Sequence, residues 1–543
     1  MNGIHINQLG YRPNDPKKAV IPCTAAASPD TRSDENETDF QIIRVSDNAL
    51  AYSGKAGGHI ADSASADTVR IADFSDFKEA GEYVIRTSSA QSYPFKIDDN
   101  PYTGLRAALL EMFNYQKCGV DLECGLWSHP ACHAAPATVY GTSEKKDVTG
   151  GWHDAGDYGR YIVPAAKAVA DLLLAHEFSS SPDSQLPDTV RFEIEWMLKM
   201  QDENTGGVYH KVSCERFDAL DEMPHDEKGE LILSPVSATA TADFAASMAL
   251  ASRFFPKDKD TLLNAAKRAW NWCAANPDAP GFKNPHGIST GGYGDDNDRD
   301  ERFWAACELF AATGDETYHD YIKSSEFLGG GRRDDERNNG RTGERKSAIF
   351  PFGLGWGNVE TYGHIAYLMS PGITDNAIKQ GIKNKLLRSC DDIMELYGKS
   401  PYGVSLGEVY RWGSNMTVAN NAMMLILGNR LASGGREYTE AALEHFHYLL
   451  GKNPLSQSYI TGFGPTAPKN PHHRPSAAKG SAVPGMVVGG PCMNVTRDSG
   501  INAHCADAPP AKRYVDHKDS FASNEITIYW NSPVYFVMAA LDL

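Results

Sequence analysis

Residues 96–116, "KIDDNPYTGLRAALLEMFNYQ", mark the point at which the sequence changes from strand-like to helix-like. The run "KIDDNPYTG" is rich in residues that favour turns, and we interpret it as a junction between two domains. From "LRAALLEMFNYQ" onward, apolar residues recur at the spacing of an amphipathic helix. A chain of 543 residues is too long for one ordinary domain. We therefore predict a first domain at residues 1–97 and a second at residues 98–543.

The residues before the junction are predicted to form a small all-β domain. Segments such as "KKAVIP", "DFQIIRVSD", "DTVRIADF" and "GEYVIRTSS" are short, rich in β-branched residues and bounded by turn residues. This pattern is typical of an antiparallel β-sandwich of about a hundred residues.

The residues after the junction are predicted to be mostly α-helical. Apolar residues recur with helical periodicity in about twelve stretches, and none of these has the pattern of a buried strand. The stretches are 103–117, 163–178, 189–202, 239–255, 260–275, 300–313, 316–327, 356–369, 376–397, 416–432, 437–451 and 526–541. Long loops separate several of them, at 203–236, 278–299, 328–355 and 452–524. Loops of this length inside a compact domain are usually functional.

Composition and charge exclude several classes of protein. With 41% hydrophobic and 22% charged residues the chain has the composition of a globular protein. Its formal net charge of −18 argues against binding to nucleic acid and to anionic membranes, and no apolar run is long enough to span a bilayer. The ten cysteines are scattered without a disulfide framework, and the first residues lack the pattern of a signal peptide. We therefore expect a cytoplasmic protein, or a secreted one if a leader has been removed.

Three constellations far apart in the sequence could carry chemistry. The stretch "GGWHDAGDYGRY" contains Asp154 and Asp157, "NPHHRP" contains His472 and Arg474, and "YVDHKDSFASNEITIYWNS" contains Glu525. Hydrolysis of a glycosidic bond with inversion needs one carboxylate that activates water and one protonated acid for the leaving oxygen. A closed ring of helices would bring the acid pair and the distant glutamate together, and His and Arg nearby would hold sugar hydroxyls.

Each constellation also has a simpler structural explanation. Asp and Gly together commonly form turns, which accounts for Asp154 and Asp157 without any catalysis. His472 and Arg474 could belong to a hydrogen-bonded loop. A glutamate such as Glu525 is a common residue in the first turn of a helix. The combination of the three is what favours an enzyme.

Five segments in the same order resemble glycoside hydrolase family 9 over essentially the whole chain. "IHINQLGYRPNDPKKAV" is similar to the immunoglobulin-like N-terminal domain of that family. The resemblance then continues through "DVTGGWHDAGDYGRYIV", "SYITGFGPTAPKNPHHRP", "VPGMVVGGPCMN" and "YVDHKDSFASNEITIYWNS". It implies a catalytic domain that is an (α/α)6 barrel of six inner and six outer helices, which agrees with the twelve helical stretches.

The resemblance also implies a role for each site residue. Asp157 would be the general base and Asp154 its partner in holding the water, while Glu525 would be the proton donor. His472 and Arg474 would lie at the sugar.

Two further features concern the binding of substrate. Thr466 departs from the Asn, Lys or Arg that the family usually has at this position, which leaves the substrate contacts there open. Trp152, Tyr514 and Trp530 are candidates for stacking on sugar rings, with packing in the protein core as the alternative explanation for each.

A zinc site is predicted close to the acid pair. Two thiolates and two imidazoles suit a closed structural zinc, and members of the resembled family with an immunoglobulin-like domain carry zinc in this region. Cys124 or His129 could compete as a ligand, and buried thiols beside surface histidines would be the alternative without metal. The four predicted ligands are Cys118, Cys132, His133 and His153.

A calcium site is a further possibility that the resemblance implies. "GGYGDDNDRDE" crowds hard oxygen ligands on a glycine-rich loop, which suits calcium, and the family often binds this ion near an Asp-Glu pair such as Asp300 and Glu301. Solvated acids that cap a helix explain the same residues. The other acids of the loop are Asp295, Asp296 and Asp298.

The predicted function is therefore inverting hydrolysis of β-1,4-linked oligosaccharides, with no organic cofactor. We favour an exo-β-glucosaminidase, because a cytoplasmic member of the family would not meet insoluble cellulose. The alternative within the family is an endo-β-1,4-glucanase, and the alternative from another class is an inactive sugar-binding protein. The sequence leaves the oligomeric state open.

Overall fold

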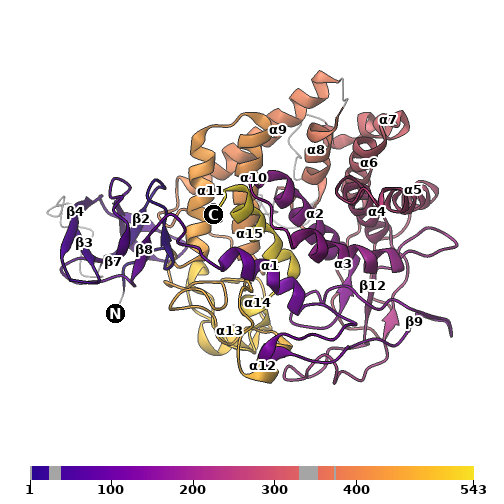
Figure 1. Cartoon of the computed structure of the whole chain (residues 1–543), viewed down its shortest axis with the longest axis horizontal. Helices are drawn as coiled ribbons and strands as arrows, with labels where there is room; N and C mark the ends of the chain where they lie inside the picture. The colour runs from indigo at the N-terminus through magenta and orange to yellow at the C-terminus, as the bar shows by residue number, and fades with distance from the viewer. Residues whose placement is uncertain (1–2, 24–37, 329–351, 372–374) are drawn as a thin grey trace.

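The computed structural model describes residues 3–23, 38–328, 352–371 and 375–543. It consists of an N-terminal β-sandwich that lies beside a larger helical domain (Figure 1). Most of the predicted loop at 328–355 lies outside the described residues. Among the described helices none is both long and apolar enough to cross a membrane.

The N-terminal domain is built of two facing sheets. One has the strand order β1-β8-β7-β3-β4 and the other the order β2-β6-β5. Alternate strand residues point inward and form a core of their own, which includes Phe40, Tyr83 and Phe95. The strands are β1 (Gly10–Tyr11), β2 (Lys18–Pro22), β3 (Thr38–Arg44), β4 (Leu50–Ala56), β5 (Ile60–Asp62), β6 (Asp67–Asp73), β7 (Gly81–Arg86) and β8 (Phe95–Ile97). The predicted β-sandwich is confirmed.

Six helices form the inner ring of the second domain. They are α2 (Ile162–Phe178), α4 (Ala238–Phe254), α6 (Arg299–Thr313), α8 (Glu360–Met369), α10 (Ser414–Ala432) and α15 (Ile528–Ala540). Helix α15 packs against both α2 and α10, so the last helix of the chain closes the ring that α2 began. Most of their residues are buried on every side, as expected of helices enclosed by other helices.

Six further helices form the outer ring and are amphipathic. They are α1 (Leu105–Tyr115), α3 (Leu186–Lys199), α5 (Lys259–Ala275), α7 (Glu316–Ser324), α9 (Asn376–Tyr397) and α11 (Arg436–Leu449). Helices α3 and α5, for example, bury one face on the inner ring and leave the other to solvent. Helix α11 is instead buried on all sides from residue 441 to residue 449, where the β-sandwich contacts it. The twelve helices coincide with the twelve predicted stretches, and the predicted (α/α)6 barrel is confirmed.

The helical domain also contains short strands, which the sequence did not predict. They form one sheet in the order β10-β9-β13-β12-β11. Two or three residues are too few to show the alternation that identifies a strand, and these strands lie outside the twelve helical stretches. The strands are β9 (Ala137–Val139), β10 (Lys145–Lys146), β11 (Arg160–Tyr161), β12 (Lys211–Ser213) and β13 (Ile232–Leu233), and β12 is fully buried. The long C-terminal loop adds the short helices α12 (Arg474–Lys479), α13 (Ser499–His504) and α14 (Phe521–Asn524).

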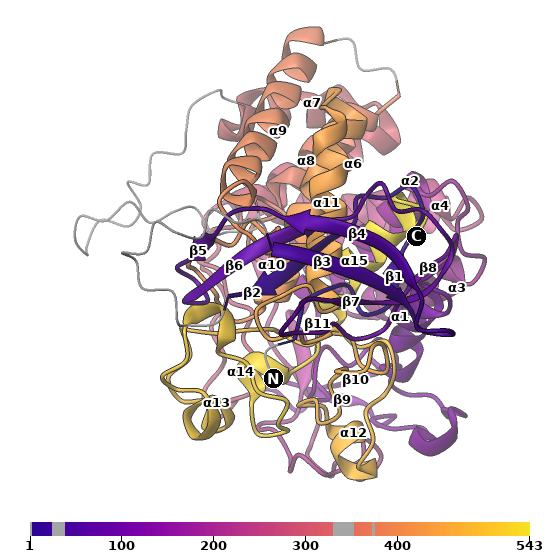
Figure 2. The same ribbon diagram turned by 90° about the vertical axis from the view of Figure 1, so that its left-hand side faces the viewer.

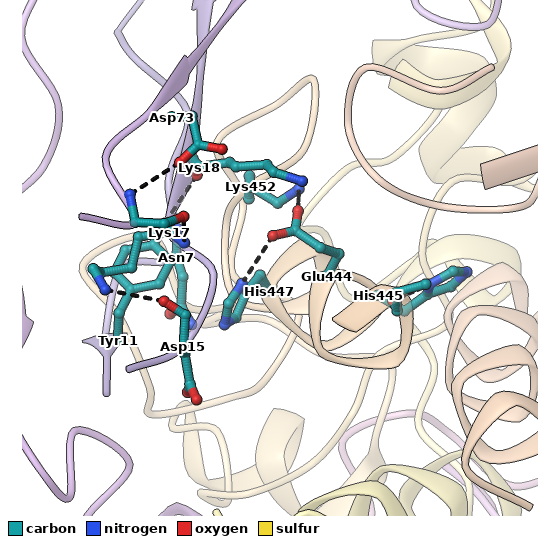
Figure 3. A network of polar contacts seen from close by, with 12 residues as sticks. Asn7, Tyr11, Asp15, Lys17, Lys18, Asp73, Glu444, His445, His447 and Lys452 are labelled. Carbon is teal, nitrogen blue, oxygen red and sulfur yellow. Dashed lines mark hydrogen bonds and ion pairs between the residues drawn. The ribbon is translucent and has the colours of Figure 1, made fainter. Parts of the chain in front are cut away.

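The β-sandwich is joined to the barrel by buried polar contacts. Figure 2 shows its strands in front of α10, α11 and α15. In Figure 3, Glu444 of α11 lies between Lys452 and His447, and the ring of Tyr11 meets that of His447 edge-on. Gln8 also accepts a hydrogen bond from the Thr466 hydroxyl at 2.9 Å. Thr466 therefore serves the contact between the two domains.

Candidate active site

A cavity of about 490 Å³ contains the three predicted catalytic carboxylates. Asp154 and Asp157 reach it from the loop that precedes α2, and Glu525 reaches it from the segment between α14 and α15. These segments are more than 360 residues apart in sequence (525 against 157). The closure of the helical ring by α15 is what brings them together, because the backbone N–H of Ile528 donates to the carbonyl of Asp154 at 2.8 Å.

Asp154 is held in a tight loop with one carboxylate oxygen bound and the other unbound. Its backbone N–H donates to the carbonyl of Gly159 at 2.9 Å, and Oδ2 accepts from the Tyr293 hydroxyl at 2.5 Å. Oδ1 is buried and has no hydrogen-bond partner among the described residues. Burial and the neighbouring Asp157 raise the pKa of Asp154 well above its ordinary value. Asp154 thus lines the cavity with one carboxylate oxygen whose hydrogen-bonding capacity is unused by the described residues.

Asp157 is surrounded by more donors than Asp154. Its Oδ2 accepts from the backbone N–H of Gly159 at 3.0 Å and from the Tyr161 hydroxyl at 3.2 Å. Burial raises the pKa of Asp157, while Arg474 and the two hydrogen bonds act in the opposite direction. Of the two aspartates, Asp157 is therefore the one whose ionised form the protein stabilises more.

Glu525 has an environment that favours its protonated form. Its backbone is fixed on two sides, by pairing with His472 and by the N–H of Gly489, which donates to the Glu525 carbonyl at 2.9 Å. Burial, and then the charges of Asp157 and Asp154, raise the pKa of Glu525 well above its ordinary value. A carboxylic acid that keeps its proton beside an ionised carboxylate is the pairing that general acid and general base catalysis requires.

Residues 154–159, which carry Asp154 and Asp157, form a segment that we call the acid loop, and His472 and Arg474 lie behind it. Nδ1 of His472 donates to the carbonyl of Lys518 at 2.6 Å, and burial lowers the pKa of this histidine to about 4, so the ring is neutral. Arg474 donates to the carbonyls of Gly156 and Asp218 at 2.8 and 2.9 Å. Its guanidinium thus ties the acid loop to the loop after β12 and places a positive charge near Asp157 and Glu525.

The predicted stacking residues fall in different places. Trp530 lines the cavity. Tyr514 is not among the lining residues, because its ring packs edge-on against Tyr459 and its hydroxyl donates to Asn524 at 2.7 Å. Trp152 is 1% exposed and packs against Phe113, so it belongs to the core.

Several aromatic residues that line the cavity were not identified from the sequence. Tyr161 lies in β11 and Tyr529 in α15, whereas the others lie in loops. Single aromatic residues of this kind carry no periodic signal. Long loops were predicted to be functional, but these aromatic residues were not among the ones considered for substrate binding. The aromatic residues are Tyr161, Phe217, Tyr293, Trp356, Trp412 and Tyr529.

Two thiols and two imidazoles converge beside the acid loop. The donor atoms of Cys118, Cys132, His133 and His153 all lie within 4.8 Å of one another. The two sulfur atoms are 3.8 Å apart, and each sulfur is 3.6 or 3.7 Å from a histidine nitrogen. These separations match a tetrahedron with zinc–sulfur bonds of about 2.3 Å and zinc–nitrogen bonds of about 2.1 Å.

The surroundings of this group also fit a structural metal. Nε2 of His133 bonds to Oε2 of Glu227 at 2.7 Å, which is the kind of contact that orients metal-ligating histidines. Neither of the predicted competitors belongs to the group. Cys124 is partly exposed, and His129 is bonded through Nδ1 to the carbonyl of Pro130.

The acids predicted for calcium are divided between two environments. Asp298 pairs with Arg302 at 2.8 Å, whereas Asp300 and Glu301 are buried at the start of α6. Both oxygens of Glu301, and both of Asp243 in α4, lack a hydrogen-bond partner among the described residues. Buried carboxylates without donors need protons or a cation, and the pKa values of both groups are raised by burial and then by the negative charge of Asp300. The residues present therefore fit a calcium ion.

A barrel of six inner and six outer helices with acids and aromatic side chains in a cavity at the ends of its helices defines a glycoside hydrolase. Residues 102–538 match glycosyl hydrolase family 9, and residues 1–92 match the cellulase N-terminal ig-like domain. The chain belongs to glycosyl hydrolase family 9 and is an inverting hydrolase of β-1,4-glycosidic bonds.

Known proteins of this family resemble the chain over its full length. Cellodextrinase of Butyrivibrio fibrisolvens is 34% identical over 568 residues and covers 100% of both chains. Endoglucanase D of Acetivibrio thermocellus is 34% identical, over 99% of this chain and 83% of that protein. A thermostable endoglucanase of Alicyclobacillus acidocaldarius, solved as a single mutant, has a TM-score of 0.88 and 35% sequence identity over 100% of both chains. These relatives do not support the expected exo-β-glucosaminidase activity.

Proposed function

We propose that this enzyme is an endo-β-1,4-glucanase that cleaves neutral cellulose-type chains, including soluble cello-oligosaccharides. The observation that carries the proposal is the wall of the cavity. In the described part of the chain its charged side chains are the three carboxylates and Arg497, and most of the others are aromatic or small. A glucosamine unit would bring an ammonium group that needs a further carboxylate partner, whereas aromatic faces suit the apolar faces of glucose. The named activities of the relatives support the same substrate class.

In this proposal the three carboxylates share the inversion reaction. Asp157 accepts a proton from the attacking water, and the unbound Oδ1 of Asp154 holds and orients that water. Glu525 donates its proton to the leaving glycosidic oxygen. The raised pKa of Glu525 and the donors around Asp157 support this division of roles.

The products distinguish the proposed substrate from the glucosaminidase alternative. The purified enzyme is incubated separately with cellotetraose and with a chitosan tetramer, and the products are followed over time by mass spectrometry. We expect internal cleavage of cellotetraose, with cellobiose among the first products, and little action on chitosan. Stepwise release of glucosamine from the chitosan tetramer would overturn the proposal, and binding of both without cleavage would favour an inactive sugar-binding protein.

Substitution of the acids tests their roles. Asp157→Ala and Glu525→Gln should each lower kcat on cellotetraose by a factor of roughly a thousand or more, since each removes one half of the acid–base pair. Circular dichroism and thermal unfolding serve as the folding control. Near-native turnover in either variant would show that its residue does not have the proposed role. For Asp157→Ala, added azide should restore part of the activity by taking the place of the base.

Two metal ions complete the proposal. Zinc would be held by Cys118, Cys132, His133 and His153 and would brace the acid loop without entering the reaction, because the four ligands close its coordination. Calcium would neutralise the buried acids around Glu301. The cellular location stays a prediction.

A further inference from the structure

Tyr161 is placed by the short strand β11 directly opposite Lys211 of β12. The two residues are register partners in the antiparallel pair, so their side chains are neighbours on the same face of the small sheet. Nζ of Lys211 lies 5.5 Å from the centre of the Tyr161 ring, a separation at which a cation and an aromatic face attract each other.

The Tyr161 hydroxyl has little freedom to leave Asp157. A methyl group added at Gly159 would come within 2.3 Å of this hydroxyl, and one added at Gly291 would come within 3.0 Å. The two glycines therefore leave a close-fitting space for it, from which it donates to Oδ2 of Asp157 at 3.2 Å. Burial and the adjacent carboxylate raise the pKa of Tyr161, which keeps the hydroxyl protonated and able to donate.

Lys211 also holds the loop that carries Tyr293. It is fully buried and donates to the Thr290 hydroxyl at 2.9 Å and to the carbonyl of Gly291 at 2.5 Å. Its neighbour His210 bonds to the carbonyl of Gly292 at 2.8 Å. The residue after Gly292 is Tyr293, whose hydroxyl donates to Oδ2 of Asp154.

The two tyrosines form a pair, each on one aspartate. The rings of Tyr161 and Tyr293 pack edge-to-face with their centres 5.0 Å apart. Tyr161 holds Asp157 and Tyr293 holds Asp154, so the spacing of the rings sets the spacing of the carboxylates. Both rings depend on β12, through the Lys211 side chain and through the loop that it anchors.

We infer that Tyr161 and Lys211 are positioning residues for the general base of this enzyme. Tyr161 orients the Asp157 carboxylate and stabilises its ionised form, and Lys211 fixes the Tyr161 ring and supplies a buried positive charge beside the aspartate pair. The inference rests on the proposed function, since it takes Asp157 as the base.

Other charged and titratable groups act on Asp157 and bear on a pH measurement. Arg474 favours its ionised form, whereas the negative charge of Glu227 disfavours it. Asp157 interacts electrostatically with Asp154 and Glu525 in the cavity and with Lys211 from β12. His210, the residue before β12, is titratable as well, but burial lowers its pKa to about 3 and so keeps it neutral. The variants below leave these other groups in place.

The test compares Tyr161→Phe and Lys211→Gln with the wild type on cellotetraose. Phe keeps the ring and removes the donor, and Gln keeps a donor for the Gly291 carbonyl and removes the charge. In both variants the ionised carboxylate loses a stabilising partner, so its pKa rises. We expect the acidic limb of the kcat/KM profile to move up by about one pH unit, with kcat lower by about tenfold and KM changed by less than about twofold.

Tyr209→Phe is the matched control. Tyr209 lies on the same segment and donates to Oδ2 of Asp202 at 3.1 Å, outside the cavity. It should leave the pH profile as in the wild type. If Lys211→Gln unfolds, the profile of Tyr161→Phe decides the question.

The Asp157→Ala variant distinguishes a failure of the positioning inference from a failure of the proposed function. If it is inactive while Tyr161→Phe and Lys211→Gln keep the wild-type acidic limb, the positioning inference is overturned and the proposed base stands. If Asp157→Ala stays active, the proposed base is wrong and the inference falls with it. If the acidic limb moves up in Tyr161→Phe and Lys211→Gln and Asp157→Ala is inactive, the positioning inference and the proposed base are both supported.

Discussion

Tyr293 shows how a single residue can organise the reaction centre without belonging to a recognisable motif. Its backbone is held at a φ of +45°, a left-handed conformation that is unfavourable for a bulky residue. Its hydroxyl donates to Asp154 and contacts the Tyr529 hydroxyl at 3.4 Å. Strain of this kind persists where the surrounding structure enforces it, and active sites are common places for it.

Removing the hydroxyl of Tyr293 should therefore impair the orientation of the water. In Tyr293→Phe, Asp154 loses its hydrogen bond and both of its oxygens become free to accept alternative partners. We expect kcat to fall by about tenfold with a smaller change in KM, measured on cellotetraose. The Tyr209→Phe variant serves again as the control, and an unchanged kcat in Tyr293→Phe would show that Asp154 is oriented by other contacts.

The acid loop is the structural element on which the catalytic geometry depends most. It lies between two anchors. On one side His153 precedes Asp154 and belongs to the group of zinc-type ligands, and on the other side β11 (Arg160–Tyr161) pairs with β12. Glu227 extends the first anchor to the loop after β12 by its bond to His133. A metal at this group would hold two long segments together across the edge of the cavity.

Removing the metal is therefore expected to loosen this element. The purified protein should contain about one zinc per chain by elemental analysis, and Cys132→Ser should lower that content together with the melting temperature. Cys390→Ser removes a buried thiol of α9 that contacts α10, leaves the predicted zinc ligands untouched and is the matched control. Equal zinc content in Cys132→Ser and wild type would refute this ligand set.

At the scale of the whole molecule, the β-sandwich and the barrel share a buried network of charges. Glu444 and Lys452 are each 2% exposed in their side chains and 2.5 Å apart, with His447 beside them and Tyr11 of the sandwich against that histidine. Burial tends to raise the pKa of Glu444, but Lys452 and His447 lower it more strongly, so the net shift is downward. The sandwich packs against this network through Tyr11, and Thr466 adds a separate contact between the two domains through Gln8.

Breaking this network should destabilise the folded protein. Glu444→Gln leaves the Lys452 ammonium buried without its partner, which costs about 3–5 kcal/mol of unfolding free energy, measurable by urea denaturation. Because the folded-state pKa of Glu444 is depressed, its contribution is present above its unfolded pKa of about 4.3 and is lost as the pH falls below it. The difference between variant and wild type should therefore narrow in acid.

The control for this measurement is a surface pair on the same helix. Glu440→Gln removes an ion pair with Arg436 whose side chains are 43% and 84% exposed. Its effect should stay below about 1 kcal/mol. An effect of Glu444→Gln as small as that of Glu440→Gln would show that the buried network does not stabilise the folded protein.

Local patterns in the sequence were sufficient for the long helices, the β-sandwich and the chemical groups of the site. The twelve long helices follow from apolar periodicity, which each segment carries by itself, and the sandwich follows from short β-branched runs. The carboxylates Asp154, Asp157 and Glu525, and the four zinc-type ligands, stood out because their residue types are chemically distinctive in short motifs. Strands of two or three residues, such as β11 and β12, are too short for any pattern.

Only the tertiary structure decided which side chains meet. Tyr161, Lys211 and Tyr293 come from three separate segments, and their contacts with the two aspartates depend on strand register and on the path of a loop. The same applies to Thr466 and Tyr514, which were considered for substrate contacts and lie at the domain contact and in the core. Periodicity and motifs record interactions between near neighbours in the chain, whereas a catalytic cavity is made when the closing of the helical ring brings distant segments together.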